Sequence, residues 1–257
     1  MPQGTKRLDD LAASDMIQEI SPNDRMFGGD HKHYFFVAKS ALKNILNALR
    51  IAEKTEVGRI LDYTCGHGRV TRALQAAFPQ AELVAADIDK DGVEYCAKTF
   101  GAQPVVIEKW PPNLPCEGGF DLIWCGAFLS HLSEARFRAF LEFLLDKLAE
   151  GGILVCTLHG RYAIHRQHHK AKYMEDELFD LIVEDYYYRG FGFSGYKNKK
   201  ESDPDYGTDK FGISVARPSW TLGVLERMPN VRILCYTEKS FADHHDVFSI
   251  VKQTGFM

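Results

Sequence analysis

Short apolar runs alternate with longer segments of helical character through the middle of the chain. The runs are apolar on both faces, which is typical of strands that helices cover on both sides. We predict strands at Gly58–Tyr63, Glu82–Asp87, Pro104–Ile107, Phe120–Cys125 and Ile153–Leu158. Helices are expected between them at Arg69–Phe78, stopped by Pro79, and at Lys90–Phe100, which Asp89 is expected to cap and Gly101 to end. A third is expected at Ser133–Ala149, with Ser133 as its N-cap and Gly151 and Gly152 past its end. This alternation indicates βαβ units and a parallel sheet.

The pattern differs at both ends of this region. Residues 1–30 are polar and predict an arm with little regular structure, and apolar residues at helical spacing predict a helix from His33 to about Ala52. After His159 the alternation stops, so residues 160–216 are expected to be an insertion. The last segments predict a helix and then an antiparallel hairpin, at Pro218–Met228, Val231–Tyr236 and Val247–Val251.

The insertion combines an aromatic cluster with a charged stretch. The charged stretch, Lys197–Asp205, is expected to be a solvated loop. The aromatic residues either pack as a lid on the core or form a wall of a pocket; they are Tyr186, Tyr187, Tyr188, Phe191, Phe193 and Tyr196.

Composition places the chain among ordinary globular proteins. Of 257 residues, 45% are hydrophobic and 26% are charged, and the net charge of -4 argues against a nucleic-acid partner. The six cysteines form no C-x-x-C pair, which fits a reducing, cytoplasmic location and predicts no zinc site of the usual spacing. The polar first residues predict no secretory signal, and apolar runs of fewer than ten residues predict no membrane span.

A glycine turn after the first predicted strand indicates a bound nucleoside. Asp62 ends the apolar run, and Gly66 and Gly68 follow before the next helix. Such a turn lets a ligand approach the backbone closely. Asp87 ends the second predicted strand, where a carboxylate can accept both hydroxyls of a ribose. Together these residues predict an enzyme with a nucleoside cofactor.

Four motifs resemble the class I S-adenosylmethionine-dependent methyltransferases over roughly residues 55–160. They are Ile60–Gly68, Val84–Asp89, Phe120–Gly126 and Leu148–Leu154. The resemblance implies a Rossmann-like three-layer α/β sandwich, with a mostly parallel seven-stranded sheet and an antiparallel last strand. The expected organisation is an N-terminal arm and helix over 1–54 and a methyltransferase domain over 55–257. A substrate-capping insertion is expected at about 160–216.

A looser resemblance concerns two further stretches. Ile20–Asp24 and His244–Val247 look like a bacterial subgroup of unassigned methyltransferases that is often linked to glycan genes. That resemblance implies a small-molecule or glycan acceptor. A homodimer stays open as an expectation.

The family resemblance implies S-adenosyl-L-methionine as the cofactor and assigns roles by motif. Asp62 would orient the amino end of the cofactor, Asp87 would accept the ribose hydroxyls, and Ile88 would pack on the adenine. The other expected cofactor contacts are Thr64, Gly66, Gly68, Trp110, Cys125 and Gly126. Glu108 and Trp110 depart from the aspartate that the family usually has after strand three.

Two other readings compete with a methyltransferase. A NAD(P)-dependent oxidoreductase prefers a third glycine three residues after the second, and Thr71 occupies that position. A cofactor-binding scaffold without catalysis is the second alternative, against which the complete set of acidic and glycine positions argues.

Histidines gather where the sheet is expected to bind ligands, outside the carboxyl ends of its strands. His131 follows strand four, His159 follows strand five, and His244 and His245 precede the last strand. We therefore expect an O-methyltransferase for a small polar or sugar-like acceptor, with His159, His131 or His244 as catalytic base. An N-methyltransferase or a protein methyltransferase is the alternative. No metal is expected, because His165 and His169 lack a third ligand.

Overall fold

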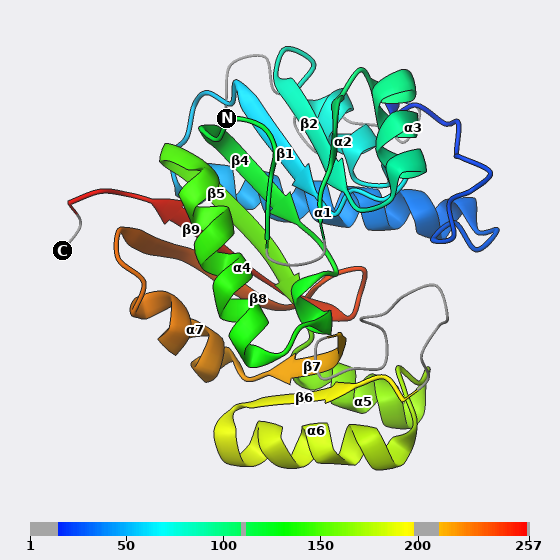
Figure 1. Ribbon diagram of the computed structural model, residues 1–257, viewed down its shortest axis with the longest axis vertical. Coiled ribbons are helices and arrows are strands. Elements are labelled where there is room, and N and C mark those ends of the chain that lie inside the picture. The colour runs from blue at the N-terminus through cyan, green and yellow to red at the C-terminus, as the bar shows by residue number, and fades with distance from the viewer. Residues whose placement is uncertain (1–14, 109–111, 198–210, 256–257) are drawn as a thin grey trace.

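A computed structural model describes residues 15–108, 112–197 and 211–255. Seven strands form one sheet in the order β3-β2-β1-β4-β5-β9-β8 (Figure 1). The strands of this sheet are β1 (Arg59–Tyr63), β2 (Glu82–Asp87), β3 (Gln103–Val106), β4 (Phe120–Cys125), β5 (Leu148–Leu158), β8 (Val231–Phe241) and β9 (His245–Lys252). Neighbouring strands from β3 to β5 pair in parallel, and β9 pairs antiparallel with both β5 and β8. The predicted sheet with its antiparallel last strand is thus confirmed.

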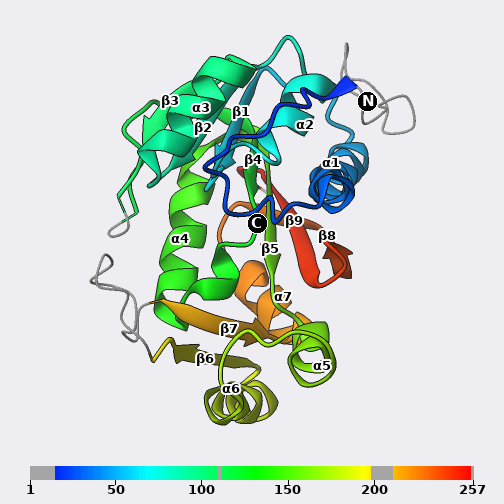
Figure 2. The ribbon, with the colours of Figure 1, turned by 90° about the vertical axis from the view of Figure 1, so that its right-hand side faces the viewer.

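Helices cover both faces of the sheet, on opposite sides in the turned view (Figure 2). One layer contains α1 (His31–Ile51), α2 (Thr71–Ala77) and α3 (Lys90–Phe100), and the other contains α4 (Glu134–Lys147) and α7 (Pro218–Glu226). Alternate strand residues enter the two cores, because successive side chains of a strand point to opposite faces. Leu122 and Trp124 pack with the first layer, whereas Ile123 and Cys125 pack with the second.

The segment between β5 and α7 forms a smaller unit at one end of the sheet (Figure 1). It contains α5 (Arg161–His169), α6 (Asp176–Arg189) and an antiparallel pair of strands, β6 (Phe191–Gly195) and β7 (Gly212–Ala216). Its own apolar cluster includes Phe179, Ile182 and Val215. The unit joins the main sheet where the Ala216 amide donates to the carbonyl oxygen of His159.

Several predicted boundaries need correction. The helix predicted from Arg69 begins at Thr71, because Gly68 still has a left-handed φ of 81° and belongs to the turn. Strand β5 begins at Leu148, not at Ile153, so the preceding helix ends at Lys147. Of the predicted caps, Asp89 does accept bonds from the first amides of α3, whereas Ser133 makes no side-chain capping bond to α4.

The two strands of the insertion, β6 and β7, were not predicted. Phe191 and Phe193 lie on β6, but Tyr187 and Tyr188 are exposed on α6. The aromatic residues therefore form neither one lid nor one wall. The charged stretch lies outside the described residues, apart from Lys197.

Candidate active site

The turn after β1 brings the chain back toward the end of β2. Thr64, Gly66 and Gly68 have φ angles of 65°, 53° and 81°. A Cβ on Gly68 would lie 2.3 Å from the Phe100 ring, whereas a Cβ on Gly66 would have no described atom within 4 Å. Gly68 is therefore required for packing, and the backbone at Gly66 faces open space that a ligand can approach.

Asp87 links this turn to β2. One oxygen of its carboxylate accepts from the Gly66 amide at 2.8 Å, and the other accepts from the Asp89 amide at 2.9 Å. Burial raises the pKa of Asp87, and both amide hydrogen bonds counteract this shift. Each carboxylate oxygen keeps a second lone-pair site, so Asp87 retains the capacity to accept hydroxyl groups.

Asp62 lies beneath the turn and is only 1% exposed. Its carboxylate accepts from the Thr71 hydroxyl at 2.6 Å. Burial raises the pKa of Asp62 to about 7, and the Asp87 charge adds to the shift. Thr71, which stands where a dinucleotide-binding turn would have its third glycine, is thus a partner of Asp62.

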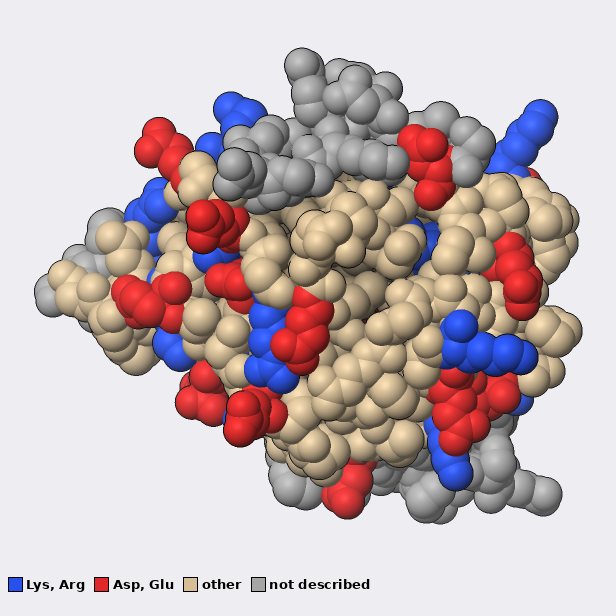
Figure 3. Space-filling view, turned by 90° about the horizontal axis from the view of Figure 1, so that it is seen from above, with Lys and Arg blue, Asp and Glu red and all other residues tan. Residues whose placement is uncertain are grey.

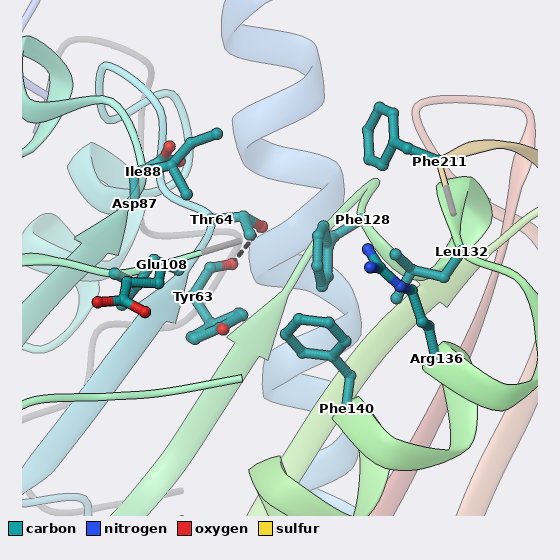
Figure 4. A pocket seen from close by; sticks show the side chains of 11 residues that line it. Tyr63, Thr64, Asp87, Ile88, Glu108, Phe128, Leu132, Arg136, Phe140 and Phe211 are labelled. Atoms are coloured by element: carbon teal, nitrogen blue, oxygen red, sulfur yellow. Dashed lines mark hydrogen bonds between the residues drawn. The ribbon is translucent and has the colours of Figure 1, made fainter. Parts of the chain in front are cut away.

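A mostly apolar cavity of about 210 Å³ opens beside Asp87 (Figure 4). Thr64, Asp87, Ile88, Ile107 and Glu108 line one end of it. Ile88 is 49% exposed there, which leaves its side chain available to a ligand. The expected contact Trp110 lies outside the described residues. Asp62, Gly66, Gly68, Cys125 and Gly126 are not among the residues that line this cavity.

The other end of the cavity was not found from the sequence. Phe128, Leu132, Arg136, Phe140 and Phe211 line it, and the sticks in Figure 4 show the Arg136 guanidinium between Phe128 and Leu132. Four of these residues lie on or just before α4, and their spacing in the sequence resembles that of ordinary helical core positions. Phe211 comes from a segment 71 residues further along the chain, so no local signal marks it.

The end of β4 contributes less side-chain surface than expected. Cys125 is fully buried between the sheet and α4, so only Gly126 of this pair presents a surface. A Cβ on Gly126 would lie 2.7 Å from the Trp124 indole nitrogen. The turn therefore requires glycine at this position for packing alone.

The structure brings the four predicted histidines into one row at the carboxyl end of β5. Ring centroids are 6.2 Å apart for His131 and His159, 4.5 Å for His159 and His245, and 4.3 Å for His245 and His244. His131 stacks on Phe211, a cavity residue, with centroids 5.2 Å apart. His131 is therefore beside the cavity, and the other three extend away from it.

The surroundings of these histidines favour their neutral form. Burial lowers the pKa of His131 and His244, and lowers the pKa of His159 and His245 well below 6.5. The Nδ1 atom of His131 lies 2.9 Å from the Gly212 carbonyl oxygen, to which it donates. The Nε2 atom of the neutral ring then carries the lone pair that can receive a proton.

The polar segment before α1 also reaches the glycine turn. Asn23 donates to Asp91 at 2.8 Å, and the same Asp91 oxygen lies 3.0 Å from Nε2 of His67 in the turn. The buried Arg72 donates to the carbonyl oxygens of Ile17 and Glu19. Part of the predicted N-terminal arm therefore stabilises the turn and the helix that follows it.

None of the described helices is long and apolar enough to cross a membrane. Seen from above, acidic and basic side chains are interspersed among the described residues of that face, without one large basic patch (Figure 3).

Comparison with known proteins identifies the central region. Residues 60–152 match the family model of a methyltransferase domain. A malonyl-[acyl-carrier protein] O-methyltransferase from Halalkalibacterium halodurans is 31% identical over 112 residues, which are 39% of this chain and 41% of that protein. The chain thus spans less than half of that relative.

Two solved structures share the fold. The plantazolicin methyltransferase BpumL, in complex with SAH, has a TM-score of 0.56 at 13% identity, with 91% of each chain covered. An S-adenosylmethionine-dependent methyltransferase from Clostridium acetobutylicum has a TM-score of 0.55 at 13% identity, covering 88% of this chain and 93% of the other. Residues 60–152 therefore resemble a methyltransferase domain, and the fold around them is that of the two solved methyltransferases.

Proposed function

We propose that the protein transfers a methyl group from S-adenosylmethionine to an oxygen atom of a small polar acceptor. The observation that carries this proposal is the position of Asp87. Its carboxylate fixes the glycine turn through Gly66 and also borders the cavity whose other end includes Phe211, on which His131 stacks. One site thus combines a nucleoside-binding carboxylate with a neutral base.

The residues present fit this cofactor. The open space above Gly66 admits the methionine part, Asp87 accepts the ribose hydroxyls, and exposed Ile88 packs on the adenine. We further propose that Asp62, beneath the turn, holds the amino end, and that Thr64, Gly68, Cys125 and Gly126 shape the backbone around it. When bound, the cofactor supplies an activated methyl group, so the protein mainly has to align the acceptor and exclude water.

The acceptor end is the part of the cavity beyond Phe128. Apolar side chains there exclude water, and Arg136 adds a guanidinium that suits an anionic group on the acceptor. His131 can receive the acceptor proton at Nε2, because its Nδ1 hydrogen is held by Gly212. His159, the first candidate from the sequence, lies one ring further from the cavity, so His131 is the preferred base.

The acceptor class follows from this chemistry. A hydroxyl group needs a base, whereas a carboxylate of the kind named for the Halalkalibacterium relative does not. Small hydroxylated compounds, including sugars, and carrier-bound carboxylates are therefore the two groups of acceptors to compare.

The test begins with calorimetric titration of the full chain with S-adenosylhomocysteine and with NADH. Methyl transfer from labelled S-adenosylmethionine is then measured on the two groups of acceptors, on amines and on protein. We expect binding of S-adenosylhomocysteine and transfer to oxygen. Failure to bind it would support a scaffold, and binding of NADH would support an oxidoreductase.

The variant His131→Gln tests the base. General-base catalysis typically contributes about 100-fold or more, so kcat for a hydroxyl acceptor should fall by about 100-fold with little change in KM. His165→Gln, on an exposed residue of α5, is the matched control. An equal kcat for His131→Gln and the wild type would assign transfer to a carboxylate or to another base.

A further inference from the structure

Three of the histidines form a compact group next to the proposed active site. His159 directly follows β5, His245 is the first residue of β9, which pairs with β5, and His244 directly precedes β9. One ring nitrogen from each residue lies within 4.8 Å of the others. The pairing of two antiparallel strands therefore brings together residues that are more than 80 positions apart in the sequence.

The hydrogen bonds of the His244 and His159 rings leave one nitrogen lone pair of each ring unused. Nδ1 of His244 lies 2.6 Å from the Ala242 carbonyl oxygen, so it donates and leaves the lone pair on Nε2. His159 has a hydrogen bond to the backbone of Ser214, while its Nδ1 has no partner among the described residues. In metal sites, the second ring N–H of a ligating histidine commonly donates to a backbone carbonyl in this way.

Burial makes the unused nitrogens costly. His159 is 2% exposed and His245 is 5% exposed, and in the part of the chain that is described Nδ1 of both rings lacks a hydrogen-bond partner. A buried polar atom without a partner costs about 1–3 kcal/mol. Packing alone would be served as well by phenylalanine, so the two imidazoles point to a ligand that uses their lone pairs.

We propose that His159, His244 and His245 bind a divalent transition-metal ion such as Zn²⁺. Three neutral imidazoles are a common ligand set for zinc that leaves a fourth position open. Tetrahedral coordination at zinc–nitrogen distances of 2.0–2.1 Å requires nitrogens about 3.4 Å apart, so the rings have to rotate slightly inward from the present spacing. Nitrogen ligands favour zinc and its transition-metal neighbours over Mg²⁺ or Ca²⁺. This proposal departs from the expectation of no metal.

The surroundings define the fourth position. Arg166 acts electrostatically on all three rings, and Arg69 acts on His244. These positive charges repel a metal ion whose fourth ligand is neutral water. They favour an anion, such as hydroxide or a carboxylate, as the fourth ligand. The open side is at His244, which is half-buried, whereas the other two rings are enclosed. An anionic acceptor or its analogue could enter from that side.

The metal site and the base do not compete. An imidazole nitrogen that binds a metal cannot also receive a proton, so His159 would act as a ligand and His131 would stay free as the base. The metal proposal does not rest on methyl transfer, because metal binding can be measured without cofactor or acceptor.

The experiment uses the full chain, freed of metal by a chelator and titrated with Co²⁺. Tetrahedral Co²⁺ gives visible d–d absorption, and its displacement by Zn²⁺ reports the zinc affinity. We expect one Co²⁺ per chain, and a thermal midpoint that rises with Zn²⁺ concentration. Absence of the d–d bands in the wild-type protein would overturn the proposal.

Two variants and a matched control locate the site. His244→Gln and His159→Phe should each weaken Zn²⁺ binding by at least about 100-fold, since each removes one of three ligands. His165→Gln should leave it unchanged, although His165 and His169 form an exposed pair with ring centroids 4.7 Å apart. Loss of binding only in His165→Gln would move the site to α5 and refute the proposal.

Folding and cofactor binding are followed in the same samples. Metal-free His244→Gln should unfold at the same temperature as the metal-free wild type. It should also bind S-adenosylhomocysteine with the wild-type affinity. Metal binding without S-adenosylhomocysteine binding would leave the metal proposal standing and reject the methyltransferase proposal; the reverse result would reject only the metal site.

Discussion

The two halves of the sheet's carboxyl edge satisfy their polar groups in different ways. At the end of β2, Asp87 is bonded to two backbone amides from neighbouring segments, and Asp89 caps α3. At the end of β5, Nδ1 of His159 and Nδ1 of His245 are buried without a partner among the described residues. The β2 end is thus held by hydrogen bonds to the protein's own backbone, whereas the β5 end holds two of the ring nitrogens that we propose to bind a metal ion.

This difference reflects how each half is assembled. On the β2 side, the Asp87 carboxylate satisfies backbone amides of the turns that follow the adjacent strands β1 and β2. The β5 side joins the end of one strand to the start of another and to an inserted unit, so side chains meet only after long-range pairing.

The largest expected effect concerns the β5 end. A Cβ on Gly160 would lie 1.8 Å from the carboxylate of Asp246, which accepts bonds from the Tyr236 hydroxyl and the Lys239 amide. Gly160→Ala should therefore lower the free energy of unfolding by about 3 kcal/mol, through overpacking and disturbed buried hydrogen bonds. Chemical denaturation measures this value.

The control for this change is Gly223→Ala in α7. A Cβ there would have no described atom within 4 Å, so alanine should stabilise the helix by up to about 1 kcal/mol. Equal stabilities for the two variants would show that the β5 end can move to accommodate the added methyl group.

The next largest effect tests the β2 end directly. Asp87→Ala removes a charged acceptor for two ribose hydroxyls and for the Gly66 amide, so the Kd for S-adenosylhomocysteine should rise by about 100-fold. Asp89→Ala changes a neighbouring carboxylate without removing this acceptor and should alter the Kd by less than about threefold. Calorimetry on both variants compares them; similar affinities would mean that the ribose is bound elsewhere.

The turn at the ends of β1 and β2 was easier to locate from the sequence than the histidine group at the end of β5, for a physical reason. Asp62, Gly66, Gly68 and Asp87 act through short-range geometry, which leaves a fixed spacing in the sequence. The same is true of Asp89 as a cap, which the structure confirms. The parallel pairing of the strands from β3 to β5 also followed from the alternation of strands and helices, whereas the strand order was not predicted.

Long-range features left no such spacing. The sequence placed His131 and His159 on one edge of the sheet, but it could not show that His159 and His245 stack or that Phe211 reaches His131. Arg136 looked like any polar residue of an amphipathic helix, although it borders the cavity. Strand β5 was predicted too short, because Gly151 and Gly152 signalled a helix end while the chain had already entered the sheet.

A smaller effect concerns the charge beneath the turn. Burial raises the pKa of Asp62 to about 7, and a cationic ligand over the turn favours its carboxylate form. As the pH falls below 7, less of this form is present, so the affinity for S-adenosylmethionine should fall by up to about tenfold per pH unit. Above pH 7 the affinity should level off.

Binding measured from pH 5.5 to 8.5, at about half-unit steps, tests this dependence around the raised pKa of Asp62. Asp62→Asn should bind more weakly at pH 8 and show a nearly flat profile. A flat profile for the wild type would mean that Asp62 supports Thr71 alone and does not sense the cofactor.

The smallest effect separates folding from cofactor binding at the β2 end. Asp89 accepts bonds from the amides of Asp91 and Gly92 at the start of α3, and loss of such a cap costs about 1 kcal/mol. Asp89→Ala should therefore lower the thermal midpoint by about 2–4 °C. Glu94→Ala, at an exposed position of the same helix, should change the stability by less than about 0.5 kcal/mol. If Asp89→Ala instead weakened cofactor binding as much as Asp87→Ala does, the turn would depend on the helix cap, and the β2 side would not be complete before the cofactor binds.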